Sequence, residues 1–279
     1  MIRQFIYKQV SRFVFPNKGI THIKRSPRII VSLTSYPGRI KVVPETIDSL
    51  LRQNLKPDAV VLWLGIEKFP NRDKDLPDKL LRYKKHGLEI RWCNDVRSYT
   101  KLVPALQTFP DDIIVTVDDD VIYQEDWLEK LYAAHIQYPE EILCHHAFSP
   151  QFDKNNEIVK LNIRKSPAIL APCEHAAGIG GVLYPPHSLH SDTTNKELFM
   201  KLAPHNDDMW FWAMAHLQNT PIRLIDGHCE NIICIPETQE AGLWQTTNSK
   251  GEGSKQFHNI INHYPQIKDL ISAVKDTHI

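Results

Sequence analysis

Short apolar runs rich in β-branched residues recur through the first half of the chain. Four segments, at 28–34, 59–64, 88–92 and 113–117, have the length and composition of β-strands, and the third of them alternates apolar and charged residues. The first, second and fourth are predominantly apolar, which is typical of strands buried on both faces. Buried strands of this kind belong to a sheet that helices cover on both sides.

Segments with helical character separate these predicted strands. The predicted helices cover residues 44–53, 77–85 and 102–109. Strands and helices therefore alternate over residues 28–140, which predicts an α/β fold with a mainly parallel sheet. In such sheets ligands bind beyond the carboxyl ends of the strands.

The pattern weakens after residue 140. Residues 178–186 form a glycine-rich loop or strand, and a very apolar helix is predicted to begin at Asp207. The polar stretch 246–254 is predicted to be a loop. The length of 279 residues suits one large α/β domain or two small ones.

Charge is distributed unevenly although the formal net charge is zero. Residues 1–44 contain nine Lys and Arg and no acid, which leaves 24 basic and 33 acidic residues in the rest. Residues 1–14 can place apolar side chains on one helical face with arginines at its flanks, as in a helix lying on acidic lipid. A solvated basic arm, or a helix packed on the domain, explains the same residues.

The cysteines and the hydropathy indicate the compartment. Five cysteines without a C-x-x-C pair argue against a disulfide framework and for a reducing environment. No stretch reaches the roughly 18 apolar residues of a membrane span. We therefore expect a cytoplasmic protein, with peripheral contact to an acidic membrane at the inner face as a separate hypothesis.

Three consecutive acids follow the fourth predicted strand, at Asp118, Asp119 and Asp120. Unpaired carboxylates this close raise one another's pKa, and a hard divalent cation such as Mg²⁺ or Mn²⁺ relieves the repulsion. In an extended segment Asp118 and Asp120 would face one site and Asp119 another. A solvated strand end explains the triplet equally well.

A second acidic pair, Asp207 and Asp208, begins the apolar helix. Acids at a helix start often only cap it and interact with its dipole. A carboxylate fixed on a rigid helix is also suited to act as a general base.

Two polar segments and a pair of glycines are candidates for ligand contact. Tyr36 and Arg39, after the first strand, are suited to stack on a base and to bind a phosphate. Asp95 and Lys101, after the third strand, offer an acid for a base or ribose and a cation for phosphate. Gly180 and Gly181 would let a substrate approach the backbone closely. Each segment is also explained as an ordinary turn or polar loop.

The order of these motifs resembles that of the GT-A glycosyltransferases. The resemblance covers roughly residues 28–245 and rests on four segments, 31–39, 114–123, 180–186 and 207–210. It is a resemblance to bacterial enzymes of polysaccharide or lipopolysaccharide assembly, and more distantly to family 2 and exostosin-like transferases. It implies a GT-A type, Rossmann-like domain at 28–245. A basic amphipathic segment or helix (1–27) precedes this domain, and a C-terminal loop and helix (246–279) follows it.

The resemblance also implies roles for individual residues. The acid triplet corresponds to a D-x-D motif, with Asp120 and Asp118 as ligands of Mn²⁺ or Mg²⁺ and Asp118 and Asp119 also near the nucleotide. The base is implied at Asp207 or Asp208, with Asp208 preferred. The nucleotide is implied to lie at positions that the chain fills with Thr34, Tyr36, Arg39 and Asp95.

The function that follows is transfer of a sugar from a nucleotide-diphosphate sugar to a glycan or glycolipid acceptor, with inversion. A nucleotidyltransferase is an alternative, although the first-strand segment has only Gly38 where a glycine-rich triphosphate loop is expected. A non-catalytic sugar-binding module of the same fold is a further alternative. No nucleic acid partner is expected.

Overall fold

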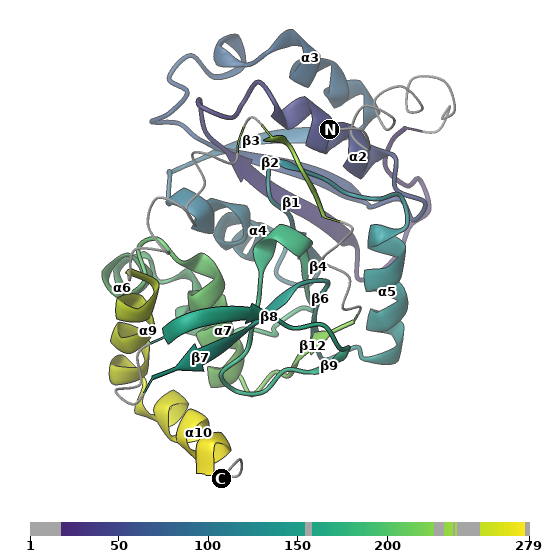
Figure 1. Ribbon diagram of the computed structural model, residues 1–279. Coiled ribbons are helices and arrows are strands. Elements are labelled where there is room, and N and C mark those ends of the chain that lie inside the picture. Colours follow the sequence, from purple (N-terminus) through teal and green to yellow (C-terminus); the bar gives the residue numbers. More distant parts are fainter. Residues whose placement is uncertain (1–17, 154–157, 226–231, 237, 239–251, 277–279) are drawn as a thin grey trace.

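The computed structural model describes residues 18–153, 158–225, 232–236, 238 and 252–276 (Figure 1). The predicted amphipathic segment at the N-terminus and most of the predicted loop at 246–254 fall outside these residues. Within the described part, no helix is long and apolar enough to cross a membrane.

An eight-stranded sheet forms the centre of the molecule, with the order β3-β2-β1-β4-β11-β6-β12-β9. Its strands are β1 (Ile29–Ser35), β2 (Ala59–Gly65), β3 (Leu88–Cys93), β4 (Ile113–Thr116), β6 (Ile142–Cys144), β9 (Ala168–Ile169), β11 (Val182–Tyr184) and β12 (Ile222–Leu224). β1 to β4 are mutually parallel, as are β6 and β12. β11 runs antiparallel between β4 and β6, and β9 is antiparallel to β12. The predicted α/β fold with a mainly parallel sheet is therefore confirmed.

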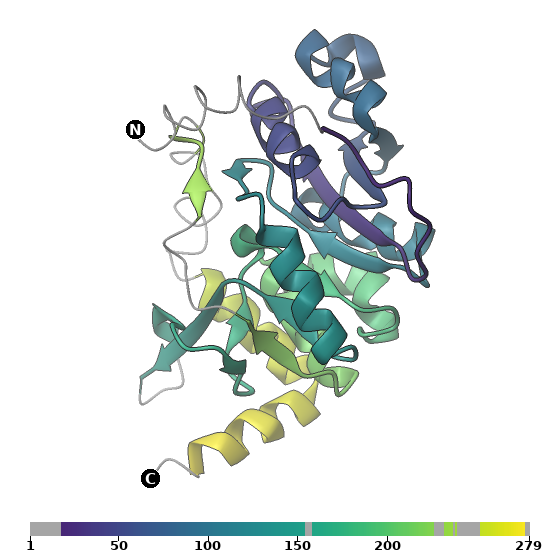
Figure 2. The same ribbon diagram turned by 90° about the vertical axis from the view of Figure 1, so that its right-hand side faces the viewer.

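Helices cover both faces of this sheet because successive side chains of the strands point to opposite sides. Ile29, Val31 and Leu33 belong to one hydrophobic core, whereas Ile30 belongs to the other. The first core is covered by α2 (Val43–Leu51), α3 (Asp78–Leu81) and α5 (Trp127–Gln137), of which α2 and α5 lie in front of the sheet in Figure 2.

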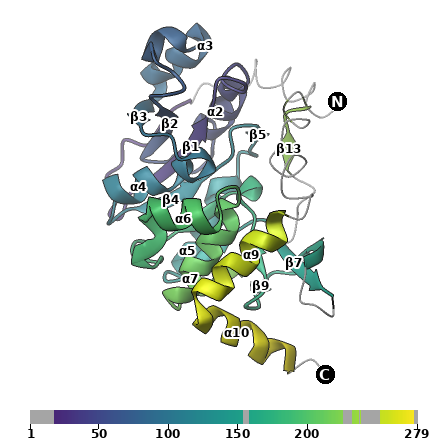
Figure 3. The ribbon, with the colours of Figure 1, turned by 90° about the vertical axis from the view of Figure 1, so that its left-hand side faces the viewer.

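The opposite face carries α4 (Val103–Thr108), α6 (Lys196–Leu202) and α7 (Asp207–Leu217), with α9 (Glu252–His263) packed on the last two (Figure 3). The predicted apolar helix at Asp207 is thus confirmed as α7. Its residues from Met209 to Ala215 are all buried. α10 (Pro265–Asp276) extends from the body at the bottom of Figure 1.

Several predicted elements differ from the observed ones in detail. The helix predicted at 77–85 is the short α3 followed by a 3-10 helix, Arg82–His86. The glycine-rich segment divides into a 3-10 turn, Gly178–Gly180, and the strand β11. The fourth strand ends one residue earlier than predicted, at Thr116.

Two smaller sheets complete the described part of the fold. β10 (His175–Ala176), β7 (Ala147–Phe152) and β8 (Ile158–Ile163) form one, and β5 (Val121–Ile122) and β13 (Ile233–Cys234) form the other. β5 directly follows the acid triplet. By pairing with β5, β13 therefore brings a segment from late in the chain close to the acid triplet.

Candidate active site

The carboxyl ends of the four parallel strands carry most of the predicted site residues. Because these strands are hydrogen-bonded neighbours, the segments that follow them lie along one edge of the sheet. Thr34, Tyr36 and Arg39 belong to the end of β1 and the turn after it; Asp95 follows β3; and Asp118, Asp119 and Asp120 follow β4. The fold therefore brings together motifs that are up to 86 residues apart, from Thr34 to Asp120.

The acid triplet forms a turn between β4 and β5, and neighbouring elements hold its backbone. The Tyr123 hydroxyl accepts from the Asp118 N–H at 3.0 Å. The buried Thr46 hydroxyl of α2 donates to the Asp119 carbonyl at 2.9 Å. The Ile235 N–H, beside β13, donates to the Asp120 carbonyl at 2.8 Å. The turn is therefore fixed by α2 and by the segment around β13.

The three acidic side chains diverge in a way that the sequence analysis did not predict. Asp119 accepts from Ser35 Oγ at 2.6 Å and from Arg39 Nη1 at 2.9 Å. Asp120 Oδ2 lies 3.1 Å from the same Arg39 nitrogen. Asp118 instead faces Lys101. The strict alternation of an extended segment is not observed, because the segment is a turn, but Asp118 and Asp120 remain close enough for Asp118 to raise the pKa of Asp120.

Lys101 lies at the centre of a cluster of carboxylates. Its Nζ is 2.9 Å from Asp118 Oδ1, 3.0 Å from Asp207 Oδ2 and 3.9 Å from Asp208 Oδ1. Burial opposes the charge of this lysine, but the three carboxylates hold its pKa well above the usual value. Lys101 is therefore a permanent buried cation that joins the acid turn to the start of α7.

A 3-10 helix, η3 (Arg97–Lys101), supplies this lysine and is itself anchored on both sides. The Ser32 hydroxyl of β1 donates to the Lys101 carbonyl at 2.5 Å. The buried Tyr99 hydroxyl donates to the Ala203 carbonyl, at the end of α6, also at 2.5 Å. Ser32 and Tyr99 were not predicted as site residues, because their roles depend on contacts with distant segments.

The two acids of α7 are adjacent in sequence but differ in environment. The Asn206 side chain accepts from the Met209 N–H at 3.1 Å and so caps the helix. The Asp207 side chain is 9% exposed and faces Lys101. The Asp208 side chain is 31% exposed, and its Oδ2 accepts from the Gly178 N–H at 3.0 Å.

Gly178 is a site residue that the sequence analysis missed. A Cβ at this position would lie 2.6 Å from Lys101 Nζ and 2.9 Å from Asp208 Oδ1. Any other residue would therefore displace the lysine or the carboxylate. The glycine-rich composition of the segment was the available signal, but it directed attention to Gly180 and Gly181.

Asp208 has the properties of a general base. Burial raises its pKa to about 7, Lys101 opposes this rise, and the negative charges of Asp207 and Asp118 add to it. A carboxylate with a pKa near neutrality takes up a proton more readily than an ordinary one and is still ionised in part at that pH. The Gly178 N–H holds Oδ2, and Oδ1 lies 3.9 Å from Lys101 Nζ.

The acid turn has the chemistry of a site for a hard divalent cation. Burial raises the pKa of Asp120, Asp118 raises it further, and Arg39 and Thr238 only partly offset the effect. Five carboxylates, including the two of α7, face two cations, Lys101 and Arg39, so the site has an excess of three negative charges when all are ionised. Asp118 and Asp120 therefore fit Mn²⁺ or Mg²⁺.

The described residues provide few further ligands for such an ion. No group of three or more His, Cys, Asp and Glu side chains that could hold a metal occurs among them. Hard cations such as Mg²⁺ often bind through one or two carboxylates together with phosphate oxygens and water. The observed donors are compatible with that mode.

The residues predicted to hold a nucleotide have distinct surroundings. Tyr36 is 40% exposed, and its ring centroid lies 5.9 Å from the Arg39 guanidinium carbon. The Thr34 hydroxyl donates to the Trp63 carbonyl at 2.9 Å. Asp95 Oδ1 accepts from the Arg97 N–H at 3.1 Å, which shapes the loop after β3. Their contact with a nucleotide stays a prediction.

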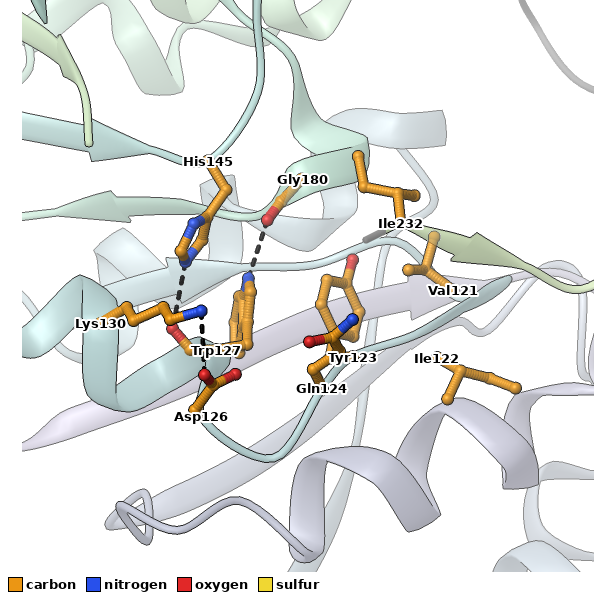
Figure 4. A pocket seen from close by; sticks show the side chains of 10 residues that line it. All are labelled: Val121, Ile122, Tyr123, Gln124, Asp126, Trp127, Lys130, His145, Gly180 and Ile232. Carbon is orange, nitrogen blue, oxygen red and sulfur yellow. Dashed lines mark hydrogen bonds and ion pairs between the residues drawn. The ribbon is translucent and has the colours of Figure 1, made fainter. Parts of the chain in front are cut away.

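Gly180 and Gly181 have a packing role in the structure. Gly181 adopts φ +83°, and a Cβ there would lie 2.3 Å from the Trp127 ring. Trp127 Nε1 donates to the Gly180 carbonyl at 2.8 Å. Gly180 also lines a small pocket between α5 and the residues around β5, in which His145 Nε2 approaches the Trp127 carbonyl and Lys130 pairs with Asp126 (Figure 4). Contact with a substrate stays a prediction for both glycines.

Solved structures of S. aureus TarS are similar to this chain at a low level. The match to TarS 1–349 has a TM-score of 0.48 and 13% identity, and covers 85% of this chain and 72% of that chain. The match to TarS 1–349 in complex with UDP-GlcNAc has a TM-score of 0.45 and 14% identity, and covers 70% of this chain and 55% of that chain. The match to a further TarS structure has a TM-score of 0.48 and 16% identity, and covers 72% of this chain and 35% of that chain. A similarity this slight does not assign a family or an activity.

No protein-family model matches the chain. No curated protein matches it either.

Proposed function

We propose that the chain is a metal-dependent, inverting glycosyltransferase with a GT-A type domain. It transfers a sugar from a nucleotide-diphosphate sugar to a glycan or glycolipid acceptor, in the synthesis of cell-surface polysaccharide. We place it in the cytoplasm, with peripheral contact to the inner membrane face as a separate hypothesis that concerns residues 1–27.

One observation carries the proposal. A single buried cation, Lys101, contacts Asp118 of the acid turn and both acids at the start of α7. A carboxylate suited to hold a metal–diphosphate and a carboxylate suited to accept a proton are thereby fixed on one side of the sheet, beyond the carboxyl ends of its parallel strands. Sugar transfer needs both groups close to the same anomeric carbon.

The acids of α7 take different roles in this proposal. Asp208 is the base because its side chain is partly exposed and its pKa is raised to about 7, by burial first and also by neighbouring acids, against the effect of Lys101. Asp207 is a positioning residue because its buried side chain faces Lys101. Lys101, which the sequence suggested as a phosphate ligand, is more consistent with positioning since three carboxylates surround it.

The reaction is a single displacement. Asp208 removes the proton from an acceptor hydroxyl, whose oxygen forms a bond to the anomeric carbon as the bond to the diphosphate oxygen breaks. The displaced group leaves as a nucleoside diphosphate, and the configuration at the anomeric carbon inverts. Gly178 keeps Asp208 oriented through its N–H.

The donor side is formed by the turn after β1 and the acid turn. Asp118 and Asp120 would hold Mn²⁺ or Mg²⁺, which would neutralise the charge that develops on the diphosphate. Arg39 would contact a phosphate. Tyr36, Thr34 and Asp95 would contact the nucleoside, with Asp118 near the ribose and Asp119 near the nucleotide.

A panel of nucleotide-diphosphate sugars, measured by thermal shift with and without Mn²⁺, tests the proposal. One donor should raise the melting temperature of the wild type only when the metal is present. Asp120→Ala should lose this shift and all turnover. Asp208→Asn should keep the shift while turnover falls by about 100-fold or more, as is typical for loss of a general base.

The alternatives give different results in the same assays. Release of pyrophosphate from a nucleoside triphosphate would identify a nucleotidyltransferase. Metal-dependent binding of a donor without transfer or slow hydrolysis would indicate a binding module. An unaltered shift and unaltered turnover in Asp120→Ala would eliminate the metal role.

A further inference from the structure

Arg39 lies where the proposed function needs a metal ion. Its Nη1 is 2.9 Å from Asp119 Oδ1 and 3.1 Å from Asp120 Oδ2. The guanidinium therefore bridges two carboxylates of the acid turn. One of these, Asp120, is the residue expected to hold the divalent cation.

The hydrogen-bond donors of the Arg39 guanidinium are not all used in this position. Its Nε is buried and has no hydrogen-bond partner within the described part of the chain. Its Nη2 makes a long hydrogen bond, 3.4 Å, to the Thr238 carbonyl. A guanidinium with unused donors gives up fewer hydrogen bonds than a fully bonded one when it changes partners, so the change costs less free energy.

Arg39 and a divalent cation cannot both stay against Asp120 without strong repulsion. The Thr238 hydroxyl already donates to the Asp120 oxygen that faces Arg39, at 3.0 Å. We infer that Arg39 is an internal counterion that occupies the cation position beside Asp120 in the absence of donor, and that it transfers to the diphosphate when metal and donor bind. This inference rests on the proposed function.

The geometry of the turn after β1 supports this exchange. Arg39 belongs to a turn in which its N–H donates to the Tyr36 carbonyl at 2.9 Å, so its long side chain projects from a loop and not from the sheet. A guanidinium binds a phosphate through the same planar pair of donors that it uses for a carboxylate. The diphosphate therefore offers an equivalent partner once the metal takes Asp120.

The consequence is that metal and diphosphate promote each other's binding. Metal alone must compete with Arg39, and diphosphate alone meets an excess of negative charge. Together, each removes the obstacle to the other, and the coupling is reciprocal by linkage. Arg39 thus disfavours unproductive binding of the metal alone.

Titration with Mn²⁺ alone tests the exchange directly, using the full chain and the relaxation of water protons to detect protein-bound Mn²⁺. Removing the competing charge in Arg39→Gln should strengthen binding of Mn²⁺ alone by about tenfold or more. Pyrophosphate should increase protein-bound Mn²⁺ in the wild type and have little effect in Arg39→Gln. A merely structural arginine would instead weaken both kinds of binding when removed.

Two further variants keep the test decisive if Arg39→Gln folds poorly. Arg39→Lys retains the charge and should bind Mn²⁺ alone about as weakly as the wild type. The double variant Arg39→Gln/Asp119→Asn removes the guanidinium together with its buried partner charge, and should still bind Mn²⁺ alone more tightly than the wild type. Unchanged or weakened binding of Mn²⁺ in a folded Arg39→Gln and in the double variant would overturn the inference.

Asp120→Asn separates failure of the exchange from failure of the proposed function. If this variant binds Mn²⁺ with pyrophosphate as well as the wild type does, Asp120 holds no metal and both proposals fail. If it loses that binding while Arg39→Gln leaves the Mn²⁺ affinity unchanged, only the exchange fails.

Discussion

Neighbouring acids in this chain differ because of the elements that surround them. Asp207 and Asp208 occupy consecutive positions at the start of one helix, yet only Asp208 is partly open to solvent and bonded to Gly178. Burial, the first cause, and the charges of two other acids raise the pKa of Asp208, with Lys101 opposing. Ionising this carboxyl therefore lowers the free energy of unfolding, and this effect can be measured without a substrate.

Asp208 should make the protein less stable as the pH rises. Its folded-state pKa, about 7, exceeds the ordinary value near 4 that it has in the unfolded chain. Below about pH 4 the carboxyl is protonated in both states and has no effect; between about pH 4 and 7 only the unfolded state ionises readily, so stability falls. Above about pH 7 the penalty is complete, at roughly 1–3 kcal/mol for a partly exposed group.

Asp208→Asn should remove this penalty. The free energy of unfolding of the variant minus that of the wild type should grow between pH 5 and pH 8, which urea denaturation at four pH values would measure. A difference that stays constant across this range would contradict the raised pKa. If Asp208 is the base, as proposed, the same ionisation predicts that turnover by the wild type falls as the pH drops below about 7, because the base becomes protonated.

Sequence patterns identified the acids of the site but not their partners. Asp118 to Asp120 and Asp207–Asp208 stand out because carboxylates cluster beside apolar segments. The contacts of Lys101 with both groups depend on how distant segments meet, which no local pattern encodes. Gly178 was missed for the same reason. Only glycine fits at this position because Lys101 and Asp208 occupy the space that a side chain would need.

At the scale of elements, the N-terminal turn of α7 determines where the proposed base lies. Asn206→Ala removes the side chain that accepts from the Met209 N–H, and should cost about 1 kcal/mol of stability. Because the first turn then frays, Asp208 loses its fixed position and turnover should fall. Urea denaturation and the turnover of the donor identified by thermal shift would measure the two effects.

Asn195 provides a matched control for this prediction. It caps α6 in the same way, accepting from the Leu198 N–H at 3.2 Å, but lies outside the acid cluster. Asn195→Ala should lower stability by a similar amount and leave turnover nearly unchanged at a temperature where both variants are folded. Equal losses of turnover in the two variants would mean that the cap of α7 has no specific role in positioning.

The elements that the sequence predicts well are those with long, uninterrupted signals. β1 and β2 are seven-residue strands of mostly apolar residues, and helix α7 has eight buried residues of eleven. The strands β6, β9 and β12 have only two or three residues each, too few to show a period, and were not predicted. They form by pairing with one another and with β11, so tertiary context decides their structure.

At the scale of the whole molecule, two hydrophobic cores share one sheet. Val182 and Tyr184 of β11 pack into one core, and Leu183 between them packs into the other. The Trp210 and Trp212 side chains report on the core that α7 covers, and Trp127 reports on the core that α2 and α5 cover. A strand that contributes to both layers links their stability.

This arrangement predicts one cooperative unfolding transition despite the length of the chain. Urea unfolding followed by tryptophan fluorescence and by far-ultraviolet circular dichroism should give coincident curves, because loss of the sheet disrupts both cores. Separate midpoints for the two signals would show that one helical layer detaches while the other persists.

The order in which the chain is made gives the Lys101 cluster a further consequence. The donor-side acids are synthesised well before Gly178 and α7, which supply the anchor of the proposed base and the base itself. An unfinished chain would therefore carry Lys101 and Asp118 without Asp207 or Asp208. Under the proposed function, a nascent polypeptide on the ribosome would be unable to consume a sugar donor until the second half of the chain had emerged and docked.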